Sequence, residues 1–186
     1  MLKRMLAPLM AVGFGLAVPT LSGASVTVLG GGLARECSVA ALKGESGSRF
    51  EELCTRALES EILSPRDRAG TYVNRGVFKL RRAEFESARF DFNRAVLLQP
   101  DLGEAYVNRG AAAVGARRYA DGLADLTHAL ELGVEEPEKA YYNRALAYEG
   151  LDDLKSAYFD YKKATEISPD WAAPQKELAR FSVERR

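Results

Sequence analysis

A short phrase occurs three times in this chain, and its spacing restricts the fold more than any other feature. It reads YVNRG at positions 72–76 and again at 106–110, and it returns as YNRA at 142–145. The Asn residues within the phrase are 34 and then 35 positions apart. A fixed period in this range indicates small supersecondary units stacked in a row rather than one closed globule. The sequence therefore predicts a repeat array, an architecture typical of binding scaffolds.

Large aromatic and very small side chains alternate at helical spacing after each phrase. Gly76 is followed by Phe92 in the first copy, and Ala145 is followed by Tyr161 in the third. Small residues let two helices approach closely, and large ones fill the space beside them. The stretch 69–169 resembles the tetratricopeptide repeat, an antiparallel helix pair of about 34 residues. The resemblance implies an all-α fold, a right-handed superhelical solenoid of helix-turn-helix repeats.

We expect five parts along the chain. Their expected bounds are a signal peptide at 1–24, a flexible mature N-terminus at 25–35, a degenerate capping hairpin at 36–63, three repeats within 64–170 (about 69–102, 103–137 and 138–171), and a C-terminal capping helix at 172–186. Caps are expected because the open ends of a repeat array would otherwise expose apolar stacking surface. Ser64, followed by Pro65, marks the start of the first repeat helix.

The N-terminus carries the pattern of an export signal. Lys3 and Arg4 precede a stretch from Met5 to residue 34 that contains no charge, with small residues at Ser22 and Ala24. This pattern predicts a secretory signal cleaved after Ala24, in a bacterial-type exported protein that is periplasmic or secreted. The alternative is an uncleaved helix that anchors the protein to the inner membrane facing the periplasm, since the uncharged stretch is long enough to span a bilayer.

The charge balance excludes two classes of partner. The chain has 26 basic and 26 acidic side chains, and removing the leader leaves 24 and 26. This balance supplies no basic surface of the kind that nucleic acid or anionic lipid requires. We therefore expect no nucleic-acid partner, and no membrane partner once the leader is cleaved.

The two cysteines, Cys37 and Cys54, both lie in the expected capping hairpin. In an oxidising compartment an even pair in one short element is most simply a disulfide. The alternative is a pair of buried thiols in a cytosolic protein. We predict the disulfide, because the leader indicates export.

The sequence offers little material for catalysis. The single His, His128, lies in the middle of a predicted helix, and no cluster has the spacing of zinc ligands. The glycines at 30–32 are not followed by the Lys-Ser/Thr of a phosphate-binding loop. We expect a protein that is not an enzyme and that uses no cofactor and no metal.

The resemblance to tetratricopeptide repeats implies a binding surface, because the first helices of successive repeats line a concave groove in that fold. The family register assigns nine residues to this groove: Val73, Asn74, Val77, Val107, Asn108, Ala111, Tyr142, Asn143 and Leu146. An Asn amide offers both donors and an acceptor, which suits the backbone of an extended peptide. The alternative is that each Asn ties one helix to the next.

A second series follows the same period. Arg75, Arg109 and Arg144 each precede an Asp by sixteen positions, which predicts one ion pair repeated in every unit. In cochaperone members of the family, Lys and Asn of the first helix grip a terminal carboxylate. This chain has Val73 and Val77 at those positions, so a clamp of that type is not expected.

The expected function is that of an exported, non-catalytic scaffold that binds a protein or peptide in the groove. The alternative is a membrane-anchored assembly subunit of an envelope complex. The sequence leaves the identity of the partner open.

Overall fold

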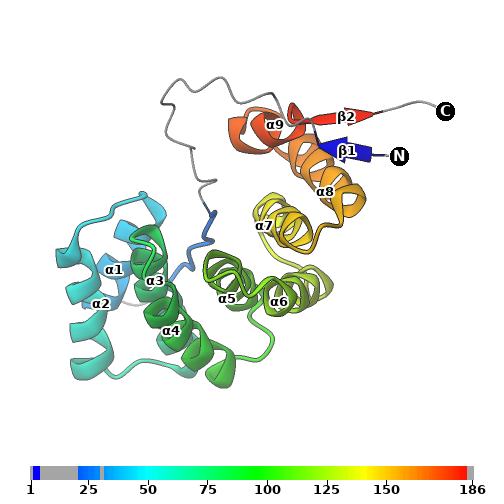
Figure 1. Ribbon diagram of the computed structural model, residues 1–186. Coiled ribbons are helices and arrows are strands. Elements are labelled where there is room, and N and C mark those ends of the chain that lie inside the picture. The colour runs from blue at the N-terminus through cyan, green and yellow to red at the C-terminus, as the bar shows by residue number, and fades with distance from the viewer. Residues whose placement is uncertain (1, 5–20, 30–31, 184–186) are drawn as a thin grey trace.

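The computed structural model describes residues 2–4, 21–29 and 32–183. Residues 5–20, which make up most of the expected signal peptide, lie outside the described residues, as do 184–186. Helices pack in consecutive antiparallel pairs that stack into a curved row (Figure 1). The described chain is thus a helical repeat solenoid, as expected.

The three repeats are three helix pairs. Their bounds are α3 (Pro65–Arg81) with α4 (Phe85–Leu98), α5 (Gly103–Gly115) with α6 (Tyr119–Leu132), and α7 (Pro137–Gly150) with α8 (Leu154–Ile167). Ser64 caps α3 as predicted, because its hydroxyl accepts a hydrogen bond from the backbone N–H of Asp67. The turn inside each pair contains a non-glycine residue with positive φ: Ala83, Arg117 or Asp152. The three units therefore share their turn geometry as well as their period.

Small residues set the distance between paired helices. A Cβ atom on Gly110 would lie 2.7 Å from Cγ of Leu126 and 3.1 Å from the carbonyl oxygen of Gly122. Gly76 meets the ring of Phe92 in the same way in the first repeat. The large partners are fully buried. The alternation of small and large residues in the sequence therefore predicted the contact between the helices of each repeat.

A helical hairpin covers the N-terminal end of the array, formed by α1 (Gly32–Leu42) and α2 (Ser48–Ser60). The hairpin begins four residues before the expected bound, because the carboxylate of Glu61 caps the N-terminal end of α1. The two oxygens of Glu61 accept hydrogen bonds from the backbone N–H groups of Leu33 (2.5 Å) and Ala34 (3.1 Å) at the start of α1.

Cys37 and Cys54 lie inside this hairpin, fully buried. Their sulfur atoms are 2.16 Å apart and their Cα atoms 5.1 Å apart. The two side chains are thus adjacent, and the disulfide remains a prediction about the protein in its compartment.

The C-terminal end differs from the expected long helix. The helix α9 (Ala172–Leu178) is short, and it is followed by β2 (Phe181–Val183), which pairs antiparallel with β1 (Leu2–Arg4). The ring of Phe181 in β2 packs on α8, with its centre 6.0 Å from that of the Tyr161 ring. The pairing places the two ends of the chain together (Figure 1).

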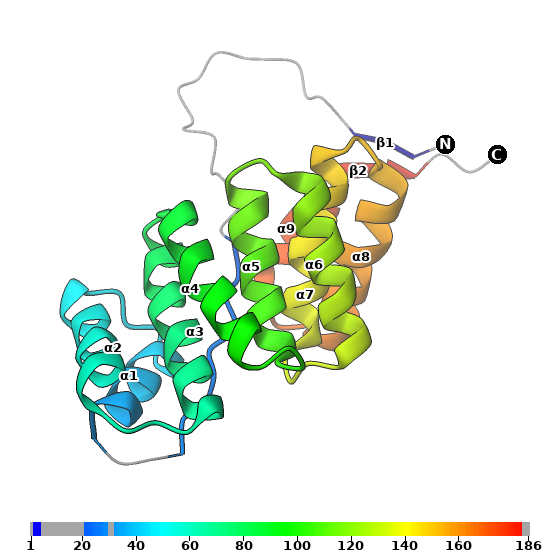
Figure 2. The same ribbon diagram turned by 90° about the horizontal axis from the view of Figure 1, so that it is seen from below.

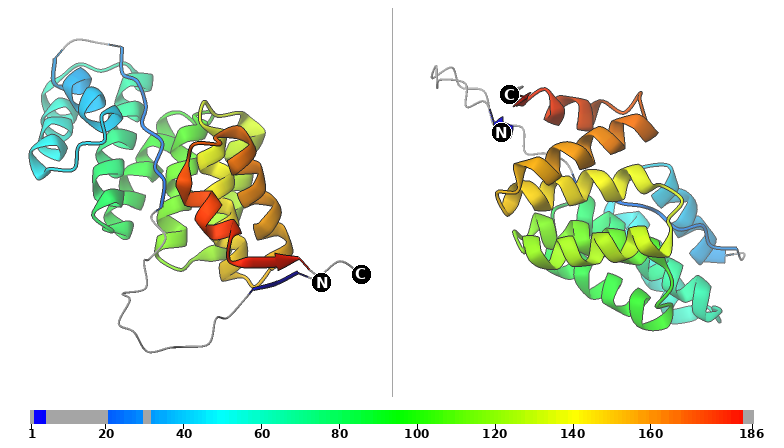
Figure 3. Two further views of the ribbon diagram at one scale, coloured as in Figure 1. Left: turned by 90° about the horizontal axis from the view of Figure 1, so that it is seen from above. Right: turned by 90° about the vertical axis from the view of Figure 1, so that its right-hand side faces the viewer.

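Residues 21–29 form what we call the N-terminal segment. It was expected to include part of a flexible stretch, but it runs extended across the first helices of the repeats (Figure 3). Among the described residues, no helix is long and apolar enough to cross a membrane.

Candidate functional site

The nine residues expected to line the groove come from α3, α5 and α7, one set from each repeat, and every one is buried. The N-terminal segment follows the inner side of the array (Figure 2) and hydrogen-bonds three of these residues, Asn74, Asn108 and Asn143. We use "concave groove" for this surface of α3, α5 and α7. In this structure the groove is therefore occupied by the chain itself.

Each groove Asn binds one residue of the segment by its backbone. The side-chain Oδ1 accepts a hydrogen bond from the backbone N–H, and Nδ2 donates to the carbonyl oxygen of the same residue. The pairs are Asn143 with Ser22 (3.2 and 2.7 Å), Asn108 with Ala24 (3.0 and 2.6 Å) and Asn74 with Val26 (2.9 and 2.8 Å). The three amides thus hydrogen-bond the backbone of every second residue of an extended strand. We call these three Asn residues the Asn ladder.

The ladder continues beyond the repeats into the capping hairpin. The hydroxyl of Ser38 in α1 donates to the carbonyl oxygen of Val26 (2.9 Å) and accepts from the N–H of Val28 (3.2 Å). The N–H of Leu29 donates to Asp67 Oδ1 (3.2 Å) at the start of α3. The segment therefore runs from α7 towards α1, opposite to the order of the repeats.

Side chains of the groove shape its centre for a small residue. Ala24 is 2 % exposed and belongs to one apolar cluster with Val107, Leu146 and other residues of the last two repeats. A Cβ atom on Gly23 would lie 3.1 Å from Oδ1 of Asn108 and 3.3 Å from a methyl group of Leu80. Such a separation is tighter than ordinary van der Waals contact. Bulk is therefore disfavoured at the middle of the segment.

The α3 end of the groove accepts branched side chains. A Cβ atom on Gly70 would lie 3.0 Å from Cγ1 of Val26 and 3.2 Å from Cγ2 of Val28. The missing side chain of this glycine leaves the space that the two valines fill. The two ends of the groove therefore differ in what they accommodate.

Sequence reasoning missed five residues that contact the segment: Ser38, Asp67, Gly70, Leu80 and Lys139. The Nζ atom of Lys139 lies 3.3 Å from the carbonyl oxygen of Gly23. Leu80 lies about one helical turn beyond Val77 on the same face, so helical periodicity could have identified it. Ser38 lies outside the repeats, and no periodic signal marks it.

Tyr142 does not fit the expectation that it lines an accessible surface. Its ring lies 5.7 Å from the ring of Tyr161 in α8 and 4.9 Å from that of Trp171, and it is 1 % exposed. Burial, together with the charge of Glu149, raises the pKa of the Tyr142 hydroxyl to about 12. Tyr142 is therefore chiefly a core residue between the last repeat and the helix that follows it.

The predicted Arg–Asp pairs are present in all three repeats. Each guanidinium donates two hydrogen bonds to the carboxylate sixteen residues later: Arg75 to Asp91 (3.0 and 2.6 Å), Arg109 to Asp125 (2.8 and 2.7 Å) and Arg144 to Asp160 (2.7 and 3.0 Å). Such fork-like pairing fixes orientation as well as charge. The pairs join the first helix of each repeat to the second. The link between helices is therefore made by the Arg residues, whereas the Asn residues of the Asn ladder bind the segment.

The Arg residues also reach the preceding repeat unit. Arg109 donates to Asn93 in α4 (3.1 Å), and Arg75 donates to Thr55 in α2 (3.2 Å). The hydrogen bond and charge of Asp125 outweigh the burial of Arg109, so the pKa of its guanidinium is raised. Each Arg therefore stays charged and joins three consecutive helices.

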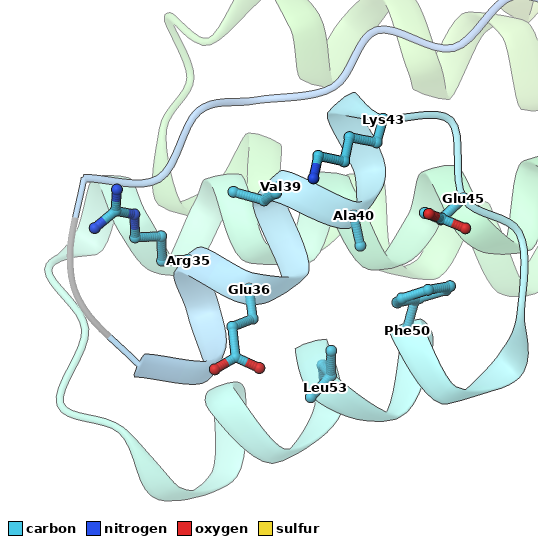
Figure 4. Close-up of a pocket in the computed structure, with 8 residues that line it drawn as sticks. All are labelled: Arg35, Glu36, Val39, Ala40, Lys43, Glu45, Phe50 and Leu53. Carbon is cyan, nitrogen blue, oxygen red and sulfur yellow. The ribbon is translucent and has the colours of Figure 1, made fainter.

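A second hollow lies on the outer side of the capping hairpin, between α1 and α2, with a volume of about 330 Å³ (Figure 4). Its lining residues are Arg35, Glu36, Val39, Ala40, Lys43, Glu45, Phe50 and Leu53. Two acidic and two basic side chains balance one another there. The hollow therefore has no net charge that would favour one class of ligand.

Groups suited to catalysis are scattered in the described part of the chain. His128 lies on the surface of α6, with its ring edge-on to Tyr106 and its Nδ1 atom 3.5 Å from a carboxylate oxygen of Glu131. Among the described residues, no three His, Cys, Asp or Glu side chains are arranged to hold a metal ion.

Comparison with known proteins agrees with the repeat geometry. The profile of the tetratricopeptide repeat matches residues 138–170, which form the third helix pair. Residues 138–170 are thus a tetratricopeptide repeat. The chain is 37 % identical over 87 residues to the Hsp70-Hsp90 organizing protein of Triticum aestivum, a match that covers 46 % of this chain and 14 % of the relative. The serine/threonine-protein phosphatase 5 of Rattus norvegicus matches at 30 % over 87 residues, covering 47 % of this chain and 17 % of the relative. The chain thus spans less than a fifth of the length of these curated relatives.

Solved structures share the fold. The second such domain of human RPAP3, in complex with the HSP70 peptide SGPTIEEVD, has a TM-score of 0.56 at 22 % identity, covering 62 % of this chain and 96 % of that one. MamA of Desulfovibrio magneticus RS-1 has a TM-score of 0.60 at 20 % identity, covering 80 % of this chain and 82 % of that one. At such identities the likeness shows that the chain shares the fold of these proteins.

Proposed function

We propose that this protein is an exported, non-catalytic scaffold that binds extended peptide segments of other proteins in its concave groove. One observation carries the proposal: the Asn ladder holds a strand by the N–H and C=O groups of every second residue. Backbone recognition of this kind gives affinity for extended peptides in general. The complex of the RPAP3 domain with an HSP70 peptide supports a peptide ligand for this fold.

The groove chemistry favours the middle of a peptide over a charged end. Amide side chains present both donors and acceptors. They can therefore hydrogen-bond an uncharged peptide backbone, and no charged group has to be buried in the groove. Val73, Val77 and Val107 come from the same helices, are fully buried, and belong to apolar clusters that also contain residues of the segment. We infer that the partner presents an apolar, strand-like stretch.

Export rests on the leader and on the cysteine pair. The charge-free stretch after Lys3 and Arg4 supports a signal peptide cleaved after Ala24, and hence a periplasmic or secreted protein. A disulfide between Cys37 and Cys54 fits such a compartment. N-terminal sequencing of protein recovered from its native host tests this part, and an intact leader would contradict it.

Affinity capture tests the binding function. The bait is the protein purified from its native compartment, and the groove variant is Asn108→Ala with Asn143→Ala. Lys162→Ala on the exposed face of α8 is the control. We expect the groove variant to lose captured partners that wild type and control both retain, with the helical circular dichroism signal unchanged. Equal capture by all three proteins would exclude the groove as the binding surface.

A further inference from the structure

We propose that the concave groove selects an uncharged, extended peptide with a very small residue opposite Asn108, and that residues 21–29 are a built-in ligand of this kind. This applies to the chain before the leader is removed: there an external peptide has to displace the N-terminal segment, whereas cleavage after Ala24 removes Ser22, Gly23 and Ala24 and opens Asn108 and Asn143 to another peptide. This inference rests on the proposed peptide-binding function. It adds a selection rule and an internal competitor.

The polar contacts of the segment do not depend on its side chains. Asn74, Asn108 and Asn143 bind backbone atoms only, and so do Ser38 and Asp67. Any extended chain offers the same groups at the same two-residue repeat. The ladder therefore recognises the extended conformation, and the residue type must be selected by packing.

Packing selects most strongly at the centre. Ala24 is almost completely enclosed, and Gly23 lies within close contact of Asn108 and Leu80. A long side chain would displace the strand from Asn108, and a charged one would be buried without a partner. Thr27 and Leu29, by contrast, are exposed, the latter to 78 %. Selection is therefore confined to the part of the peptide that faces the repeats.

The segment is held in place by a short connection. Leu29 and Gly32, the first residue of α1, are three positions apart, which spans at most about 10 Å. A short tether keeps a ligand at an effective concentration on the order of millimolar. An external peptide of similar affinity must compete with that concentration. The segment thus lowers the apparent affinity of the groove for every other strand.

Displacement variants of the full, uncleaved chain, produced without export so that residues 1–24 are retained, test the proposal. Ala24→Glu places a charge in the enclosed central position. Ala24→Pro removes the backbone N–H that donates a hydrogen bond to Asn108 Oδ1. Thr27→Glu introduces the same charge at an exposed position of the same segment and is the matched control. The probe is a fluorescein-labelled synthetic peptide with the wild-type sequence of residues 21–29, and its binding is followed by fluorescence anisotropy.

We expect both Ala24 variants to bind the probe at least tenfold more tightly than wild type, because their own segment no longer competes. Thr27→Glu should bind it as weakly as wild type. Adding Asn108→Ala to Ala24→Glu should remove the gain. A probe that itself carries Glu in place of Ala24 should bind none of the proteins.

Two results would overturn the inference, and they separate it from the proposed function. If both Ala24 variants retain the helical signal and bind the probe no better than Thr27→Glu, the segment is not a competing ligand. The capture experiment with Asn108 and Asn143 can still succeed in that case. If the probe with Glu binds as well as the unmodified probe, the groove does not select a small central residue.

Discussion

The Arg109–Asp125 pair offers a direct measure of what holds the repeats together. The perturbation is a double-mutant cycle of Arg109→Ala, Asp125→Ala and both. The side chains are 23 % and 17 % exposed, and two short hydrogen bonds join them. Removing a partner from a buried pair costs about 3–5 kcal/mol, whereas an exposed pair contributes about 0–1 kcal/mol. Partial exposure places each single variant between these limits, at about 2 kcal/mol, with a coupling of about 1.5 kcal/mol.

Urea unfolding at 25 °C, followed by circular dichroism at 222 nm, gives the free energies of the four proteins in the cycle. Arg118 and Asp121 supply the matched control, an ion pair of the same residue types at the start of α6 that is 45 % and 56 % exposed. A coupling there below about 1 kcal/mol is expected. If the Arg109–Asp125 coupling is no larger than that of the control pair, the repeated pairs are surface contacts and the reasoning fails.

Three further outcomes are expected. Gly110→Ala should destabilise the fold by about 1–3 kcal/mol, measured by urea unfolding, because its new methyl group would overlap Leu126; unchanged stability would show that α5 and α6 can separate at no cost. Tyr142→Phe should reduce the loss of stability in alkali: the folded-state pKa of Tyr142 is raised to about 12, so its contribution is complete below pH 10 and is lost as the pH rises towards 12. Thermal melts between pH 8 and 11.5 measure this, and identical pH profiles would contradict the burial argument. Cys37 and Cys54 should be alkylated only after reduction in protein from its native compartment, as read by intact mass; alkylation without reductant would exclude the disulfide.

The repeat phrase predicted the fold because each of its letters performs a task that recurs in every unit. The Arg pairs with an Asp of the second helix, as in Arg75 with Asp91. The Tyr lies beside that Arg, with the guanidinium 5.4 Å from the ring centre of Tyr72. The Gly makes room for a large partner such as Phe92. Helix packing repeats these demands at a fixed period, and a fixed period is visible in one sequence.

The occupant of the groove could not be predicted in the same way. The N-terminal segment is bound through its backbone, which every residue type carries, so its sequence shows no signal of the contact. Its only constraint, a small residue near Ala24, coincides with the small residues of a cleavage site. The packing of Tyr142 was missed for a related reason: its neighbour Trp171 follows the second helix of the third repeat, where the repeating phrase gives no signal.

The match between the Asn ladder and a strand depends on curvature. Packed helix axes are about 8–10 Å apart, whereas two residues of a strand advance by about 6.6 Å. Asn residues on successive first helices bind alternate residues of the segment, so their side-chain ends must lie closer together than the helix axes do. Only the concave side of a curved array brings them together in this way. The Arg–Asp pairs, which hold each second helix against its first, therefore preserve the spacing on which peptide binding depends. A variant that weakens Arg109–Asp125 should lower affinity for the labelled peptide in the Ala24→Glu background even though neither residue contacts the segment.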